Sequence, residues 1–136
     1  MTVRQAARRL HRWVAWLFVA AVLGQIFLAG LAMFGAADSF ALHDAFGSTV
    51  VGVVALAVLL VAVVGRLGST GVGLSFLLLV LTVVQTMLPQ ARGSLPVVAA
   101  LHPLNAVALV ALGVRLARPG SGDTPRSGDT PPGGFD

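Results

Sequence analysis

Residues 45–65 read AFGSTVVGVVALAVLLVAVVG and contain no charged side chain. A helix rises by about 1.5 Å per residue, so this stretch is long enough to cross the roughly 30 Å hydrocarbon core of a bilayer. Three more charge-free apolar stretches lie along the chain, at Trp13–Ala37, Val72–Leu88 and Gly93–Val114. None of them alternates apolar with polar residues, as a membrane strand would. The sequence therefore predicts an all-α integral membrane protein with a four-helix transmembrane bundle.

The composition agrees with a chain that lives in a bilayer. Hydrophobic residues make up 57% and charged residues 10% of the 136 residues, whereas a soluble domain has about 25% charged residues. Cysteine is absent from the sequence. This excludes disulfides, thiolate metal sites, iron–sulfur clusters and covalently attached c-type haem. Histidine is the soft metal ligand that remains.

The chain divides into three parts. A basic N-terminus at 1–12 precedes a transmembrane domain at 13–117, for which we expect spans at 13–37, 39–65, 71–89 and 95–117. The first span is too long for the core of a secretory signal peptide, so we expect it to stay in the protein. Short loops make successive helices antiparallel neighbours, in up-down-up-down order. Residues 118–136 are mostly Pro, Gly, Ser, Thr and Asp, and we expect a disordered tail.

Arginine placement predicts the orientation. Antiparallel order brings eight of the nine arginines to one side of the membrane, and only Arg92 falls in a loop on the other side. The positive-inside rule then places both termini in the cytoplasm of a bacterial plasma membrane. His11 lies among the N-terminal arginines, and we expect it at the interface near anionic lipid.

Five polar residues lie within the predicted spans, where the two histidines and Gln85 share the outer half of the bundle. Gln25 lies nearer the middle of the first span, and Asn105 follows His102 by three residues on the same face. Asp38 or Ser39 is the expected N-cap of the second helix, and Ser94 with Pro96 marks the start of the fourth. The helix rise then places two histidines about 7 and 10 Å below their helix starts, at a similar depth. Polar groups are costly in lipid, so we expect the whole set to point inward. Its members are His43, His102, Gln25, Gln85 and Asn105.

The two histidines suggest a haem site. Gly47 and Ala106 each lie four residues after a histidine and leave room for a flat macrocycle. Two neutral imidazoles from facing helices hold a six-coordinate haem b without cysteine or carboxylate. Arg92, on the same side, is the candidate partner of a propionate, and Gln25, Gln85 and Asn105 are candidate outer-shell or cavity groups.

Two other hypotheses remain open for the same residues. In the first, the chain is a cofactor-free structural or accessory membrane subunit whose histidines are packed or hydrated. In the second, these polar groups line a proton or small-solute pathway, because intramembrane polar residues mark such conduits. The second is the weaker one, since no acidic residue lies in the middle of a span and the inner half offers no polar continuation.

Two resemblances bear on this choice. The layout of His43, Gln85 and the stretch Val98-Ala99-Ala100-Leu101-His102, within Leu42 to Val114, resembles one four-helix half of haem A synthase. In that family each half carries a histidine on its second and fourth helices, which implies that His43 and His102 match axial-ligand positions. The whole chain also resembles small four-span bacterial membrane proteins of an uncharacterised domain family. That likeness includes Gln25-Ile26-Phe27-Leu28-Ala29-Gly30 and Leu101-His102-Pro103-Leu104-Asn105-Ala106.

Departures from haem A synthase limit what that resemblance implies. The family's carboxylate three residues before the second-helix histidine is replaced by Phe40, and the arginine that follows that histidine is replaced by Asp44. We therefore expect a haem-holding scaffold rather than an enzyme. One half alone would need a homodimer, or a larger membrane complex, to hold two haems. The lipid bilayer is the expected partner, and nucleic acid is not, since the arginines serve as topology determinants.

Overall fold

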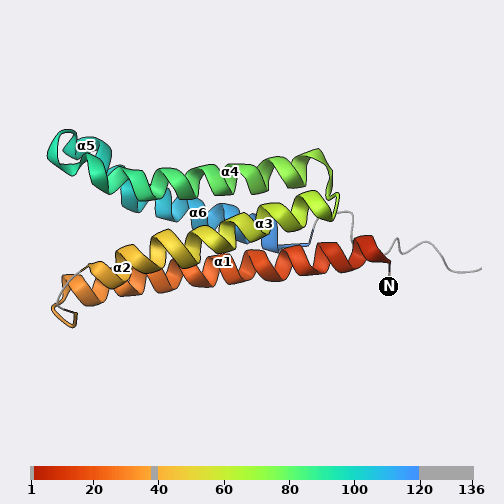
Figure 1. Ribbon diagram of the computed structural model, residues 1–136, viewed down its shortest axis with the longest axis horizontal. Helices are drawn as coiled ribbons and strands as arrows, with labels where there is room; N and C mark the ends of the chain where they lie inside the picture. The colour runs from red at the N-terminus through yellow and green to blue at the C-terminus, as the bar shows by residue number, and fades with distance from the viewer. Residues whose placement is uncertain (1, 38–39, 120–136) are drawn as a thin grey trace, which may run out of the picture.

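The computed structural model describes residues 2–37 and 40–119. Within these ranges four helical segments are long and apolar enough to cross a membrane, and no described residue lies in a β-strand. Figure 1 shows the four segments side by side and antiparallel in chain order. The prediction of four membrane-length helices in an all-helical chain is confirmed.

The first segment is the single helix α1, Val3–Met33. It begins ten residues before the expected start of the span, because Thr2 and Gln5 form a capping box that starts the helix before the arginines. The predicted basic N-terminus at 1–12 is therefore mostly helical and continuous with the span. At the other end Gly35, at φ 74°, terminates α1 in a left-handed conformation that suits glycine.

The second segment consists of α2 (Ala41–Phe46), the π-helix η1 (Gly47–Val51) and α3 (Gly52–Val64). The three run on without a break, because the residues at both junctions are helical. Phe40 precedes α2 without a side-chain cap, while the expected N-caps Asp38 and Ser39 lie outside the described residues. A π-helix inside an α-helix is rare and occurs frequently at functional sites.

The third and fourth segments both change geometry at the end away from the N-terminus. The third is α4 (Gly68–Met87) followed by the 3-10 helix η2 (Leu88–Gly93), and the fourth is α5 (Pro96–Ala99) followed by α6 (Leu101–Ala117). The expected cap Ser94 ends η2, and Leu95 precedes α5. The break between α5 and α6 falls where Pro103 would clash with the carbonyl four residues earlier, that of Ala99.

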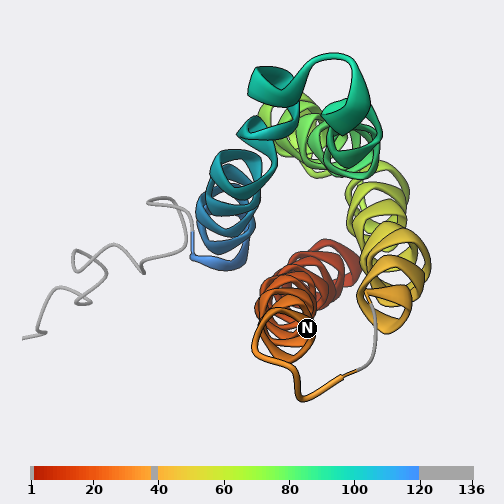
Figure 2. The same ribbon diagram turned by 90° about the vertical axis from the view of Figure 1, so that its left-hand side faces the viewer.

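The four segments form a closed ring, seen end-on in Figure 2. α1 packs against α3 and α6, and α4 packs against the same two helices. The buried side chains recur three or four residues apart, as at Ala55, Val58 and Ala62 of α3. This spacing places one narrow stripe of each helix toward the centre of the ring. Large apolar side chains cover the outer faces, a surface suited to lipid.

Glycine allows the closest contact between α1 and α6. A Cβ added at Gly113 would lie 2.8 Å from Cγ2 of Val19 and 3.2 Å from Cδ1 of Phe18. Both neighbours are buried in the core. Gly113 therefore sets how near these two helices can come.

We predict that Gly113→Ala lowers the free energy of unfolding by about 1–3 kcal/mol, because an overpacked core must move backbone or side chains. Titration of the purified protein with a denaturing detergent, followed by circular dichroism, measures this. Gly73→Ala is the matched control, since nothing lies within 4 Å of its added Cβ. Equal stability of the two variants would contradict the close contact.

Candidate functional site

A cavity of about 700 Å³ opens between the helices at the end that carries η2 and α5, which we call the histidine end. Figure 1 shows the helices spread apart at this end, with α2 on the lower side and α5 on the upper side. The cavity is lined by four of the five polar residues predicted to point inward, and the fifth, Asn105, is not part of the lining. Its volume lies in the range of sites that hold small molecules and cofactors.

His43 is fixed by two hydrogen bonds between α2 and α1. Its Nδ1 lies 3.0 Å from the backbone oxygen of Gln25, and Nε2 of the Gln25 side chain donates to the backbone oxygen of His43 at 2.7 Å. A carbonyl oxygen only accepts, so Nδ1 of His43 carries the hydrogen. In the neutral ring, Nε2 is therefore the nitrogen with a lone pair.

His102 is fixed in the same manner between α6 and α4. Its Nδ1 donates to the backbone oxygen of Gln85 at 3.0 Å. That oxygen is available because the residue four positions later, Pro89, has no N–H to offer it. Nε2 of His102 again has the lone pair, and Nε2 of the Gln85 side chain lies 3.3 Å from it as a donor.

The two imidazoles line the same cavity and lie edge-on to each other. Their ring centroids are 6.2 Å apart and their planes are inclined at 66°. Each ring comes from a different helical pair, His43 from the one formed with α1 and His102 from the one formed with α4. The fold thus brings together two rings that are separated in the sequence by most of the second segment and the whole of the third.

The two helical pairs repeat one arrangement. In each pair a glutamine of the earlier helix accepts, through its backbone oxygen, the Nδ1 hydrogen of a histidine 17 or 18 residues later. Each of these four residues is only partly exposed. Sequence inspection placed Gln25 and Gln85 near the histidines, but it missed that their backbone oxygens are what orient the rings.

The side-chain amides differ between the two halves. Asn105 donates to the side-chain oxygen of Gln85 at 2.7 Å and to the backbone oxygen of Leu81 at 2.9 Å, so the Gln85 amide is held on both sides. By contrast, the side-chain oxygen of Gln25 is buried without a hydrogen-bond partner among the described residues. A buried acceptor of this kind costs about 1–3 kcal/mol when it lacks a donor.

Two charged residues line the same cavity. Arg92 reaches it from η2, and Asp44 follows His43 on α2. Across the described ranges, no group of three or more His, Asp or Glu side chains is placed to hold a metal ion.

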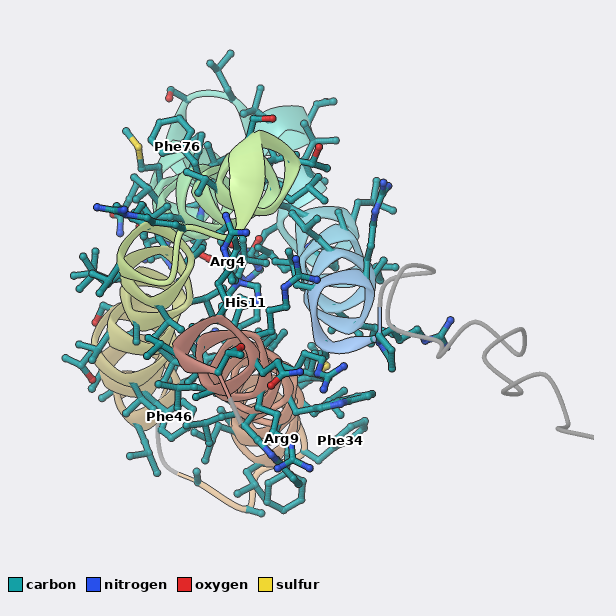
Figure 3. All side chains as sticks on the ribbon, turned by 90° about the vertical axis from the view of Figure 1, so that its right-hand side faces the viewer. Arg4, Arg9, His11, Phe34, Phe46 and Phe76 are labelled. Carbon is teal, nitrogen blue, oxygen red and sulfur yellow. The ribbon has the colours of Figure 1, made fainter. Side chains whose placement is uncertain are left out.

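The third histidine lies at the opposite end, and here the sequence-based expectation is wrong. His11 is 5% exposed, and its Nε2 lies 3.0 Å from the hydroxyl of Ser75, which is fully buried on α4. That hydroxyl donates to the backbone oxygen of Gly71, so His11 donates to it. Figure 3 shows His11 between the helices, whereas Arg9 lies on the outer side of α1. The pair is a polar link across the ring, not an interfacial group.

The fold and the site define a small helical protein with four helices long and apolar enough to cross a membrane, around a cavity lined by two histidines. Among known protein families, residues 25–92 match the family of unknown function DUF6220. The match covers half of the chain, so the chain belongs to this family. The matched region includes Gln25, His43, Gln85 and Arg92 and ends before His102. No curated protein and no solved structure matches the chain.

Proposed function

We propose that this chain is a multi-pass membrane protein that binds one haem b through His43 and His102 and serves electron transfer or haem handling. The observation that supports the proposal most strongly is the pair of imidazoles that line one cavity with their ring centroids 6.2 Å apart. Two metal–nitrogen bonds of about 2 Å, with about 1 Å from each nitrogen to its ring centre, require about 6 Å. The spacing suits one iron between the rings.

The hydrogen bonds support the same assignment. Histidine ligands commonly donate the second ring N–H to a carbonyl, which fixes the tautomer and the ring orientation. Both Nδ1 atoms do this here, so both Nε2 atoms are available to a metal. Ligation by His102 would replace the 3.3 Å contact from the Gln85 amide, which Asn105 would still hold near the ring.

Other residues of the cavity would position the cofactor. Arg92 is exposed on η2 and lines the cavity, so its guanidinium can hold a propionate at the histidine end. Ala106, one turn after His102, keeps the wall beside that ring small. Gly47 does not leave the open space expected from the sequence, because the Gln25 side chain packs against it. A haem with two histidine ligands exchanges one electron and offers no open coordination position to a substrate.

The proton-pathway hypothesis has less support. Thr82 is the deepest polar residue of the cavity wall, and the next polar group toward the other end is Ser75, two turns away on α4. Leu78, fully buried, fills the space between them. Both hydroxyls also donate to carbonyls of their own helix. In the described part of the chain the polar groups therefore form two separate clusters.

A difference spectrum tests the haem proposal. The full-length protein, purified from cells supplied with haem, should show a Soret band and a reduced-minus-oxidised spectrum of a six-coordinate haem b. We expect about one haem per chain. A colourless protein that still folds and stays monodisperse would overturn the proposal and favour the cofactor-free structural subunit.

A further inference from the structure

At the end opposite the histidine end, α3 terminates in an unusual residue. Arg66 has φ 49°, the left-handed region, and it is the only non-glycine residue in that region within the described ranges. The backbone around it forms a Schellman motif, in which the N–H of Leu67 bonds to the oxygen of Ala62 and that of Arg66 to the oxygen of Val63. This position usually holds glycine.

The chain itself provides a comparison. α1 ends in the same motif, with hydrogen bonds from Ala36 to Leu31 and from Gly35 to Ala32, and there the left-handed position is Gly35. An arginine at the equivalent position of α3 accepts backbone strain that glycine would avoid. The geometry of the turn therefore does not explain why an arginine occupies this position.

A second arginine lies beside it. Arg4 and Arg66 line one surface hollow together with Val3, Val64 and Gly65. The hollow exists because α1 and α3 touch closely here: a Cβ added at Gly65 would lie 2.7 Å from Cβ of Ala7. Figure 3 shows Arg4 on the side of α1 that faces the other helices. Asp44, at the histidine end, is the only carboxylate in the described ranges, so no described acid pairs with these arginines.

We propose that Arg4 and Arg66 together bind the phosphate of an anionic lipid headgroup. Two guanidinium groups match the charge and the oxygen geometry of a phosphate diester. Val3 and Val64, 89% and 81% exposed, supply apolar walls beside the charges, which an acyl chain can cover and a free phosphate cannot. The proposal rests on membrane insertion and is independent of haem binding.

Lipid retention tests this site. The full-length protein is purified in mild detergent, mixed with phosphatidylglycerol or phosphatidylcholine, and analysed by native mass spectrometry. Wild type should retain phosphatidylglycerol in preference to phosphatidylcholine. Arg66→Gly and Arg4→Gln should each weaken that retention about tenfold or more, because each variant loses charge-assisted hydrogen bonds from a guanidinium to the phosphate. Arg66→Gly should not lower the thermal midpoint, since glycine relieves the strained turn.

Arg115→Gln is the matched control, because it removes one positive charge from the exposed surface of α6 outside the hollow. It should retain phosphatidylglycerol as wild type does. Equal losses in all three variants would overturn the site and leave only general surface charge. Competition by millimolar inorganic phosphate would overturn the lipid assignment in favour of a free anion. A protein that binds haem but shows no lipid preference would refute this proposal alone.

Discussion

Replacing His43 or His102 by glutamine should remove almost all haem absorbance from the purified protein, while His11→Gln should leave it unchanged. The ring centroids of the two cavity histidines are 6.2 Å apart, so in the proposed haem site each ring would supply one side of the iron. His11 lies at the other end against Ser75 and cannot reach the cavity. The measurement is the Soret absorbance per chain, with circular dichroism to show that each variant is helical.

Chemical rescue separates the loss of a ligand from the loss of the fold. His102→Gly leaves an opening where the ring was, and imidazole added to the solution should restore the Soret band of this variant. The backbone oxygen of Gln85 remains in place to accept the N–H of the added imidazole. Haem retention by the double variant His43→Gln, His102→Gln would contradict the ligand assignment. So would equal loss of haem in His11→Gln.

The sequence predicts the existence of the helices better than it predicts where they begin and end. The four membrane-length helices follow from hydropathy and from the lack of alternating residues, because in lipid a single unpaired segment satisfies its backbone only as a helix. The helix ends do not follow as well. α1 begins at Val3 because of a hydrogen-bonded cap at Thr2, which a hydropathy profile does not register. Pro103, in contrast, signals the break before α6 in the sequence itself.

The rotation of each helix about its axis was not predictable from hydropathy. On α3, Ala55 and Val58 are fully buried, whereas Leu56 and Leu60 are exposed on the outer face. All four are apolar, and a helix that is hydrophobic all round carries no moment to say which face turns inward. Polar residues are the only guides in such a helix, and they are few.

In the candidate site, too, some features follow from the sequence and others do not. The helix rise places His43 and His102 at one level, and polar groups in lipid point inward, so their proximity follows from the sequence. Their acceptors do not, because every residue has a carbonyl. Pro89, four residues after Gln85, was the one available signal, since it frees that oxygen.

His11 illustrates the opposite error. Its neighbours in the sequence are arginines, which favour a position at the membrane surface. Its actual environment is set by Ser75, 64 residues away, because α1 and α4 lie across the ring from each other. A buried polar partner so distant in the sequence leaves no local pattern to detect.

Gly47→Ala should weaken haem binding about 10–100-fold, the usual cost of disturbing a group that orients a metal ligand. A Cβ at this position would overlap the Gln25 side chain, with Cδ at 3.0 Å and the amide nitrogen closer still. That nitrogen donates to the backbone oxygen of His43, so Gln25 must give up this bond and move. Because only the tip of a flexible side chain is displaced, the thermal midpoint should change little. Titration of the haem-free protein with haem measures the affinity.

A double-variant cycle shows whether Gly47 acts through Gln25. If it does, adding Gly47→Ala to a Gln25→Ala protein should cost no further affinity, since the obstructing side chain is already absent. Gly52→Ala is the matched control on the same segment, because nothing lies within 4 Å of its added Cβ. Additive losses from Gly47→Ala and Gln25→Ala would contradict the shared contact. If Gly47→Ala and Gln25→Ala each left the haem affinity unchanged, the π-helical segment after His43 would not orient the ligand.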